Sequence, residues 1–383
     1  MRSRAVLAVL LSLLVMLGGC SAVSDGEEVE PAALVSFDEE FDVQELWSSQ
    51  LAGGLGDKYQ QYRPAFLGNR IYSISADGRL AAADVERGTR LWRVDIDTAI
   101  AGGVAAGDGK LAVTSYDGRL LVFSALDGAA QWQTPLSSEA VAPAAIGGGL
   151  VLVQTIDGRL VAFNAETGER QWSYTAQKPS LTLRGTSRPL ILGDLVYAGF
   201  ANGKVVSLRL ASGEMVWESR VTVPTGQTEL ERMVDIDGDL VAGNGVLYAT
   251  TYQGRVATIA MRDGRVLWGR ELSSYRGVAE SDEQLFAVDA EGRVLGYDKV
   301  SSTELWLQEG LYFRQPTAPV YYKGAVVLAD FEGYLHFLSP QDGRFIARER
   351  VDSAGVAAPL AVRDGVLYVL GNSGRVTALT IDG

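Results

Sequence analysis

Residues 156–172 read IDGRLVAFNAETGERQW, and the same order of turn and apolar residues recurs along most of the chain. Asp157-Gly158 lies between alternating apolar positions, which predicts a tight hairpin turn because both residues tolerate a positive φ. Gly168 follows Gly158 after ten residues, and Trp172 follows it after fourteen. The stretch therefore predicts three short antiparallel strands joined by two tight turns.

The first of these turns occurs eight times in the sequence. Its copies are ADGRLAA from Ala76, YDGRLLV from Tyr116, IDGRLVA from Ile156, ANGKVVS from Ala201, YQGRVAT from Tyr252, AEGRVLG from Ala290, FEGYLHF from Phe331 and NSGRVTA from Asn372. One more strand fits ahead of each copy. Four strands per unit at a spacing of about 40 residues indicate a β-propeller.

The last unit indicates how the ring closes. It reaches Gly383 before its tryptophan-bearing strand, whereas the ELW at residues 45–47 repeats the ELW at residues 304–306 of another unit. A strand near the N-terminus would complete the last blade and remove the exposed edges of an open array. We therefore predict an all-β fold for residues 42–383. It is an eight-bladed β-propeller of four-stranded antiparallel blades, with the last blade closed by the N-terminal strand.

The tryptophans all fall at one register of the repeat. They are Trp47, Trp92, Trp132, Trp172, Trp217, Trp268 and Trp306, and the unit that starts at Phe331 has Ala347 in the same place. Because each occupies the same position of the same repeated strand, we interpret them as packing between blades rather than as a binding surface.

Residues 1–19 precede the repeats and have the features of a signal peptide: Arg2 and Arg4, an apolar run, and small residues. The LGGC at residues 17–20 resembles the bacterial lipobox, which implies that Cys20 is lipidated and becomes the mature N-terminus. By the sorting rule of Gram-negative lipoproteins, Ser21 implies the outer membrane, with the protein facing the periplasm. The alternative is an ordinary cleaved signal followed by an unrelated cysteine.

The mature chain is strongly acidic. Removing residues 1–19 deletes two arginines and no acid, so the formal net charge goes from −13 to −15. This charge argues against nucleic acid as a partner. Residues 21–40 contain seven carboxylates and no Lys or Arg, so we expect residues 20–41 to be a solvated tether between lipid and propeller.

The repeat resembles the tryptophan-docking repeat of quinoprotein dehydrogenases, which implies a quinone cofactor, calcium, a disulfide of adjacent cysteines and a catalytic Asp. The sequence departs from that set, because Cys20 is its only cysteine and His336 its only histidine. The DIDGD at residues 235–239 lacks the later Glu of a calcium loop. We predict no catalysis, no cofactor and no metal. The alternative is a quinoprotein-like dehydrogenase or quinone-binding propeller that has lost most catalytic features.

Two consecutive repeats are longer than the others, with spacings of 45 and 51 residues between turns. Both insertions follow a tryptophan strand, so we expect them to lie side by side on the face that carries the Asp-Gly turns. Residues 177–189 read QKPSLTLRGTSRP, and residues 222–240 read TVPTGQTELERMVDIDGDL. Long loops on a rigid scaffold are where binding usually resides.

These loops, the lipobox and the propeller together resemble the propeller lipoproteins of the outer-membrane β-barrel assembly machine. That resemblance implies a scaffold that binds the POTRA repeats of the core barrel subunit and aids the insertion of outer-membrane proteins. It implies partner contacts by Leu181, Leu183, Arg184, Asp235 and Asp237. Other lipoproteins of the complex would be indirect partners, and unfolded outer-membrane proteins are possible clients. A propeller of the cell envelope that displays a different partner is the second alternative.

Overall fold

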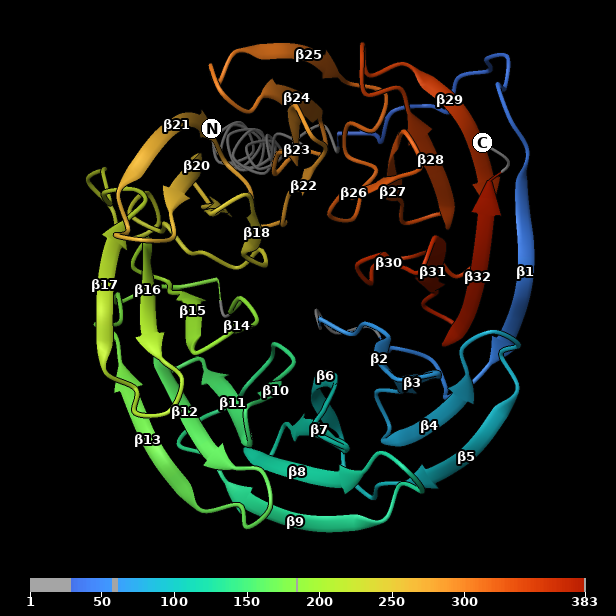
Figure 1. Ribbon diagram of the computed structural model, residues 1–383. Helices are drawn as coiled ribbons and strands as arrows, with labels where there is room; N and C mark the ends of the chain where they lie inside the picture. Colours follow the sequence, from blue (N-terminus) through green and yellow to red (C-terminus); the bar gives the residue numbers. More distant parts are fainter. Residues whose placement is uncertain (1–28, 57–60, 184, 382–383) are drawn as a thin grey trace, which may run out of the picture. The chain divides into compact units, whose positions relative to one another are not determined.

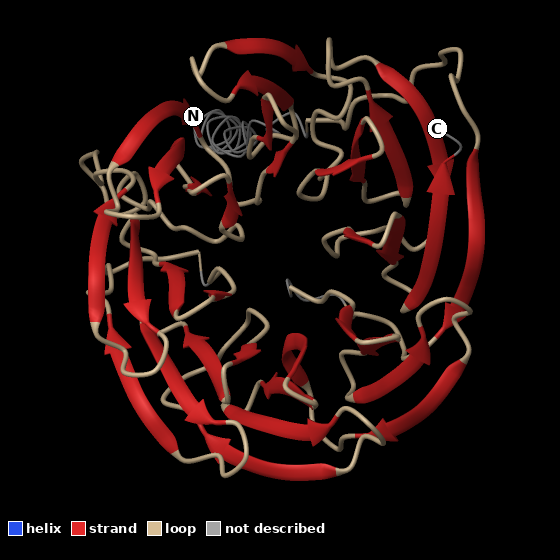
Figure 2. Ribbon diagram, viewed as in Figure 1, coloured by secondary structure: helices blue, strands red, loops and turns tan. Residues whose placement is uncertain are grey.

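The computed structural model describes residues 29–56, 61–183 and 185–381, and every regular element in them is a β-strand (Figure 2). None of the described residues forms a helix that could cross a membrane. From Ala32 onward the chain forms one unit, a ring of eight four-stranded sheets (Figure 1). The expected signal peptide, Cys20 and the first part of the expected tether lie outside the described residues.

Each sheet is an antiparallel meander whose strands run in order from the axis of the ring to its rim. Blade 1 contains β2 (Ala65–Leu67), β3 (Arg70–Ile74), β4 (Arg79–Asp84) and β5 (Arg90–Asp95); blade 2 contains β6 (Ile100–Gly107), β7 (Lys110–Ser115), β8 (Arg119–Ser124) and β9 (Ala130–Pro135). Blade 3 contains β10 (Ala145–Gly147), β11 (Leu150–Thr155), β12 (Arg159–Asn164) and β13 (Arg170–Thr175); blade 4 contains β14 (Leu190–Leu192), β15 (Leu195–Gly199), β16 (Lys204–Arg209) and β17 (Met215–Arg220).

The second half of the ring repeats this order. Blade 5 contains β18 (Val241–Gly243), β19 (Val246–Thr250), β20 (Gly254–Ala260) and β21 (Val266–Leu272); blade 6 contains β22 (Ala279–Glu280), β23 (Gln284–Val288), β24 (Val294–Asp298) and β25 (Glu304–Gln308). Blade 7 contains β26 (Val320–Tyr322), β27 (Ala325–Ala329), β28 (Tyr334–Leu338) and β29 (Phe345–Arg350); blade 8 contains β30 (Ala361–Arg363), β31 (Val366–Leu370), β32 (Arg375–Ile381) and β1 (Val43–Gln50).

Blade 8 closes the ring with strands from both ends of the chain. β1 pairs antiparallel with β32, from Val43 opposite Ile381 to Gln50 opposite Arg375. In Figure 1 the first and last strands of the sequence accordingly lie beside each other at the rim. The predicted fold is confirmed, including closure of the last blade by the N-terminal strand.

The tryptophans join successive blades. The ring of Trp172 lies over a turn of blade 4, where a Cβ atom on Gly213 would come within 2.6 Å of it, and the Trp172 indole N–H donates to Leu210 O at 2.8 Å. The same kind of bond, at 2.7–3.1 Å, is made by Trp47, Trp132, Trp217, Trp268 and Trp306. Trp92 packs on Gly128 in the same way, although its indole N–H has no hydrogen-bond partner among the described residues.

Blade 7 departs from this pattern, because β29 has Ala347 at the tryptophan position. The indoles of the other blades pack on the turn between the third and outer strands of the following blade. Blade 8 has no such turn, since its third and outer strands come from opposite ends of the chain. Phe41 and Val43 pack here instead, against a core that includes Ala347 and Ile381.

The end of the expected tether differs from the prediction. Six of the ten residues 32–41 are exposed and none is buried, but the segment lies along blade 7, where Phe37 stacks on Phe345 with the ring centroids 5.6 Å apart. This acidic segment also contains two aromatic residues, Phe37 and Phe41, whose side chains pack on the blade.

Candidate functional site

The two long loops emerge from the ring on the same face. The first long loop, residues 177–189, joins β13 to β14, and the second long loop, residues 222–240, joins β17 to β18. Ala176 N–H donates to Gly158 O at 2.9 Å, and Val221 N–H donates to Gly203 O at 2.8 Å. Each outer strand thus ends beside the Asp-Gly or Asn-Gly turn of its own blade, as the meander requires. We refer to this side of the ring as the loop face.

The second long loop holds the first by a row of carboxylates. In an extended segment alternate side chains point the same way, so the aspartates of residues 235–239 share one side. Asp235 Oδ2 accepts a hydrogen bond from Leu183 N–H at 2.6 Å, and Asp239 Oδ1 accepts one from Arg188 N–H at 3.2 Å. The two loops are therefore neighbours, as their order in the sequence predicted.

Asp237, between these two, lies against Gly185 of the first long loop. A Cβ atom on Gly185 would collide with the Asp237 carboxylate, so glycine is required by the close approach of the backbone. Burial, together with the negative charge of the neighbouring Asp235, raises the pKa of Asp237 to about 8; burial also raises the pKa of Asp235 to about 6. The pair is thus partly protonated near neutral pH.

The side chains exposed on the first long loop are apolar. Leu181 is 42% exposed and Leu183 is 36% exposed, whereas Asp235 and Asp237 are 0% and 3% exposed. The structure therefore brings four of the five expected partner residues together, and Arg184 lies outside the described residues. The burial of the two aspartates excludes the direct partner contact that was expected of them. Asp235 and Asp237 support the first long loop from the interior, and their carboxylates are not available to a partner.

A third segment reaches the loops from the other side of the ring axis and was missed by sequence reasoning. Gln61 Nε2 donates to Thr186 O at 3.1 Å and to Asp237 O at 3.3 Å, and Arg63 forms an ion pair with Asp239. Burial would raise the pKa of the Asp239 carboxyl, but the nearby guanidinium groups of Arg63 and Arg188 lower it, so Asp239 is ionised.

Chain length was the one signal for this third segment. Residues 51–64, between β1 and β2, are as many as residues 176–189, between β13 and β14. The spacing between repeated turns does not reveal the length of this connection. Residues 51–64 follow β1, which closes blade 8, and they precede the first of the repeated turns.

A cavity of about 650 Å³ opens beside these segments, lined by residues that include Gln61, Arg63, Asp239, Arg276 and Asn372. Its lining mixes ion-paired, amide and apolar groups. Among the described residues, no three His, Cys, Asp or Glu side chains gather in a way that could hold a metal ion.

The eight blades and their repeated turns define a quinoprotein-like propeller. The quinohemoprotein alcohol dehydrogenase of Comamonas testosteroni superposes with a TM-score of 0.70, covering 88% of this chain and 76% of that chain. The sequence identity is only 14%, so this likeness shows the fold alone.

The sequence places the chain in one family of such propellers. Residues 76–308 match the family described as Outer membrane protein assembly factor BamB. A protein of that description from Pseudomonas aeruginosa is 52% identical over 98% of each chain, and one from Escherichia coli is 34% identical over 95% of this chain and 96% of that protein. The crystal structure of BamB from Moraxella catarrhalis has a TM-score of 0.81 at 28% identity, covering 88% of this chain and 100% of that chain. The chain belongs to the BamB family.

Proposed function

We propose that this chain is a non-catalytic scaffold subunit of the outer-membrane β-barrel assembly complex. Its family members are described as outer membrane protein assembly factors, which supports the role in assembly. In this proposal the loop face binds the POTRA repeats of the core barrel subunit, which helps outer-membrane proteins to fold and insert. Lipid on Cys20 would hold the protein at the outer membrane, facing the periplasm. Other lipoproteins of the complex would be reached through the core subunit, and unfolded outer-membrane proteins are the clients.

The observation that carries the proposal is the supported first long loop. Its two leucines are exposed, while its backbone is held by Asp235 at Leu183 and by Asp239 at Arg188. A loop fixed before binding loses little conformational entropy when it meets a partner. Exposed leucine side chains on a fixed loop are more favourably buried against the surface of a partner protein than left in water.

Asp235 and Asp237 enter this proposal as positioning residues. They lie behind the loop, so their replacement would weaken partner binding by releasing Leu183 and Gly185. Leu181, Leu183 and Arg184 would make the direct contacts.

Site-directed crosslinking from Leu183 in living cells tests the proposal. We expect a photoreactive residue at position 183 to give a product that contains the core barrel subunit. Leu192 is the matched control: it is 38% exposed, against 36% for Leu183, but it ends β14 at the opposite face of the ring. Products only with other proteins at position 183, or equal yields at both positions, would contradict the proposed contact.

A further inference from the structure

Residues 32–41, which precede β1, contact blade 7 or the connection that leads into it at Ala32, Val35, Phe37, Glu40 and Phe41. In Figure 1 this part of the chain runs past β28 and β29 before it enters β1 at the rim. We call residues 32–41 the N-terminal strap. We propose that the outer part of blade 7 is a binding site for this strap, built from Arg314, Asp330, His336, Phe345 and Arg348. This site fixes where the chain leaves the ring.

Backbone hydrogen bonds hold the strap at both ends. Ala32 N–H donates to Tyr312 O at 2.8 Å, in the connection between β25 and β26. Glu40 N–H donates to Ile346 O at 2.8 Å, and the Glu40 side chain forms an ion pair with Arg344. The strap therefore crosses the blade from the loop face to the opposite face.

Two aromatic side chains of the strap contact the blade. Phe37 stacks on Phe345 and also lies under the guanidinium group of Arg348, which is 4.8 Å from its ring centroid. Phe41 meets Phe337 edge-on with centroids 5.6 Å apart. Aromatic pairs and cation–π contacts of this kind are attractive beyond the apolar area that they bury.

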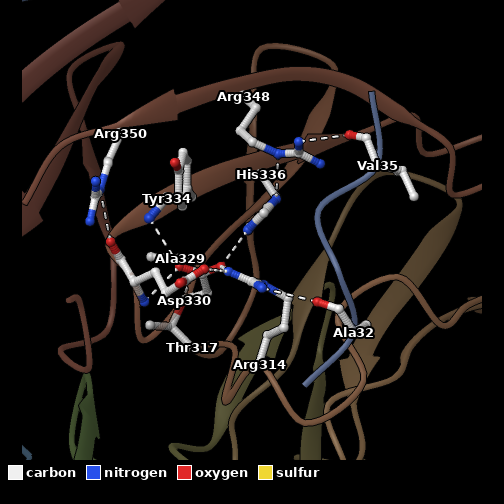
Figure 3. A network of polar contacts seen from close by, with 11 residues as sticks. Ala32, Val35, Arg314, Thr317, Ala329, Asp330, Tyr334, His336, Arg348 and Arg350 are labelled. Carbon is white, nitrogen blue, oxygen red and sulfur yellow. Dashed lines mark hydrogen bonds and ion pairs between the residues drawn. The ribbon is translucent and has the colours of Figure 1, made fainter. Parts of the chain in front are cut away.

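A buried polar network links the blade to two carbonyl groups of the strap (Figure 3). Arg314 donates to Asp330 Oδ2 at 2.8 Å and to Ala32 O at 3.0 Å. Arg348 donates to Val35 O at 2.9 Å. Arg314 is 3% exposed and Asp330 is 0% exposed, so both charges depend on these partners for compensation.

His336 connects the two arginines of this network. Its Nδ1 accepts a hydrogen bond from Arg348 Nε at 3.3 Å, since a guanidinium group only donates. The ring hydrogen therefore sits on Nε2, which donates to Asp330 Oδ2 at 2.9 Å. Burial lowers the pKa of His336, in keeping with this neutral tautomer. These hydrogen bonds connect the Ala32 carbonyl to the Val35 carbonyl. Without the strap, Arg314 would lose an acceptor at a partly buried site and Arg348 would lose one at the surface.

The position of this site follows from the closure of the ring. Blade 7 is followed by the blade that joins the two chain ends, where no turn is available to receive a tryptophan. At the tryptophan position β29 has Ala347, and Phe41 of the strap packs against the same core. The strap thus fills the junction that an indole and a turn fill elsewhere.

The strap sets how much free chain lies ahead of the ring, and this consequence rests on the proposed lipid at Cys20. With the strap seated, the chain from Cys20 to Ala32 spans at most about 40 Å. With the strap released, the chain from Cys20 to Val43 spans about 80 Å. Because Ala32 lies on the loop face, a seated strap holds that face near the membrane.

Amide hydrogen exchange on the full-length protein tests the site. We expect slow exchange at residues 32 and 40 in the wild type. Phe37→Ala, on the strap, and Arg348→Gln, on the blade, should each speed exchange across residues 32–41 by tenfold or more. Val35→Ala is the matched control, since the Val35 side chain is 51% exposed and only its carbonyl is used. Unchanged exchange in β12 and β16 shows that each variant has folded.

Exchange in the wild-type strap as fast as in an unstructured peptide would overturn the proposal, as would equal exchange in Phe37→Ala and the wild type. A second measurement separates this failure from that of the proposed function. Acylated protein on phosphatidylethanolamine–phosphatidylglycerol vesicles, labelled at Glu229→Cys, should transfer less energy to a membrane dye when it carries Phe37→Ala. If the wild type does not bind the vesicles at all, the lipid anchor is wrong while the exchange result stands.

Discussion

Trp172 shows how one side chain serves two blades. Its indole ring packs on Gly213 of the next blade, and its indole N–H donates to Leu210 O of the same blade. The side chain therefore joins blades 3 and 4 by apolar contact and by a hydrogen bond. We expect Trp172→Ala to lower the free energy of unfolding by about 3–5 kcal/mol, because it removes a large buried ring and opens a cavity. Chemical denaturation followed by circular dichroism measures the change. Gln171→Ala, the exposed neighbour on β13, should change it by less than about 0.5 kcal/mol.

The buried pair Asp235 and Asp237 makes stability depend on pH in a defined direction. Burial raises the folded-state pKa of Asp237 to about 8, above the value near 3.8 of the unfolded chain. The folded protein therefore binds more protons in this range, and the stability present at acidic pH is lost as the pH rises through 8. We expect Asp237→Asn to be more stable than the wild type at pH 9, by roughly 1–3 kcal/mol, with a smaller advantage toward pH 4. Parallel curves from pH 4 to 9 would contradict this.

Residue chemistry was the part of the site least visible in the sequence. Charged side chains are mostly exposed, so Asp235 and Asp237 were interpreted as partner contacts. In the structure they are buried behind the first long loop. No pattern in the sequence marked Gln61 or Arg63, because they reach the two long loops only when the ring closes: Gln61 bonds to Thr186 of the first loop and Arg63 pairs with Asp239 of the second. Leu181 and Leu183, for which the family resemblance implies partner contacts, are exposed on this loop.

At the scale of elements, the first long loop depends on Gly185 for its path. Gly185→Ala would drive a methyl group into the Asp237 carboxylate, so we expect the loop to shift and the ring to stay folded. The crosslink from Leu183 to the core subunit should fall at least fivefold, while the melting temperature changes by only a few degrees. In Gly147→Ala, the matched control on β10, the new methyl group would meet Ile191 at an ordinary 3.5 Å. Full crosslinking in Gly185→Ala would show that the loop does not need this path.

The elements themselves were predictable where the repeat is regular. Asp-Gly turns and tryptophans at fixed spacing located the strands of every blade, and the two long spacings located both long loops. The strap was not predicted because its binding site combines the connection between β25 and β26, β28 and β29 with a segment nearly 300 residues earlier, as in the bond from Arg314 to Ala32. No local pattern encodes a contact over that separation.

For the whole molecule, β1 is the element on which the ring depends. Without it, β32 becomes an unpaired edge and Trp47 no longer covers Gly88 of blade 1. We expect a chain that lacks residues 32–50 to elute as aggregates in size-exclusion chromatography. A chain in which only residues 32–41 are replaced by a Gly-Ser linker should elute as a folded monomer with a lower melting temperature. Monomeric, cooperatively melting protein without β1 would show that the ring does not need its closing strand.

The pairing of β1 with β32 also imposes an order of events on a newly made chain. Whether it is synthesised or threaded through a pore, the chain presents β1 first and β32 last, so the earliest strand waits longest for its partner. Contacts between residues this far apart in sequence form slowly. Until the last strand is available, seven blades can assemble while β1, with its Trp47 side chain, stays open to proteases and to chaperones. The ring can therefore close only after β32, the last strand, is available to pair with β1.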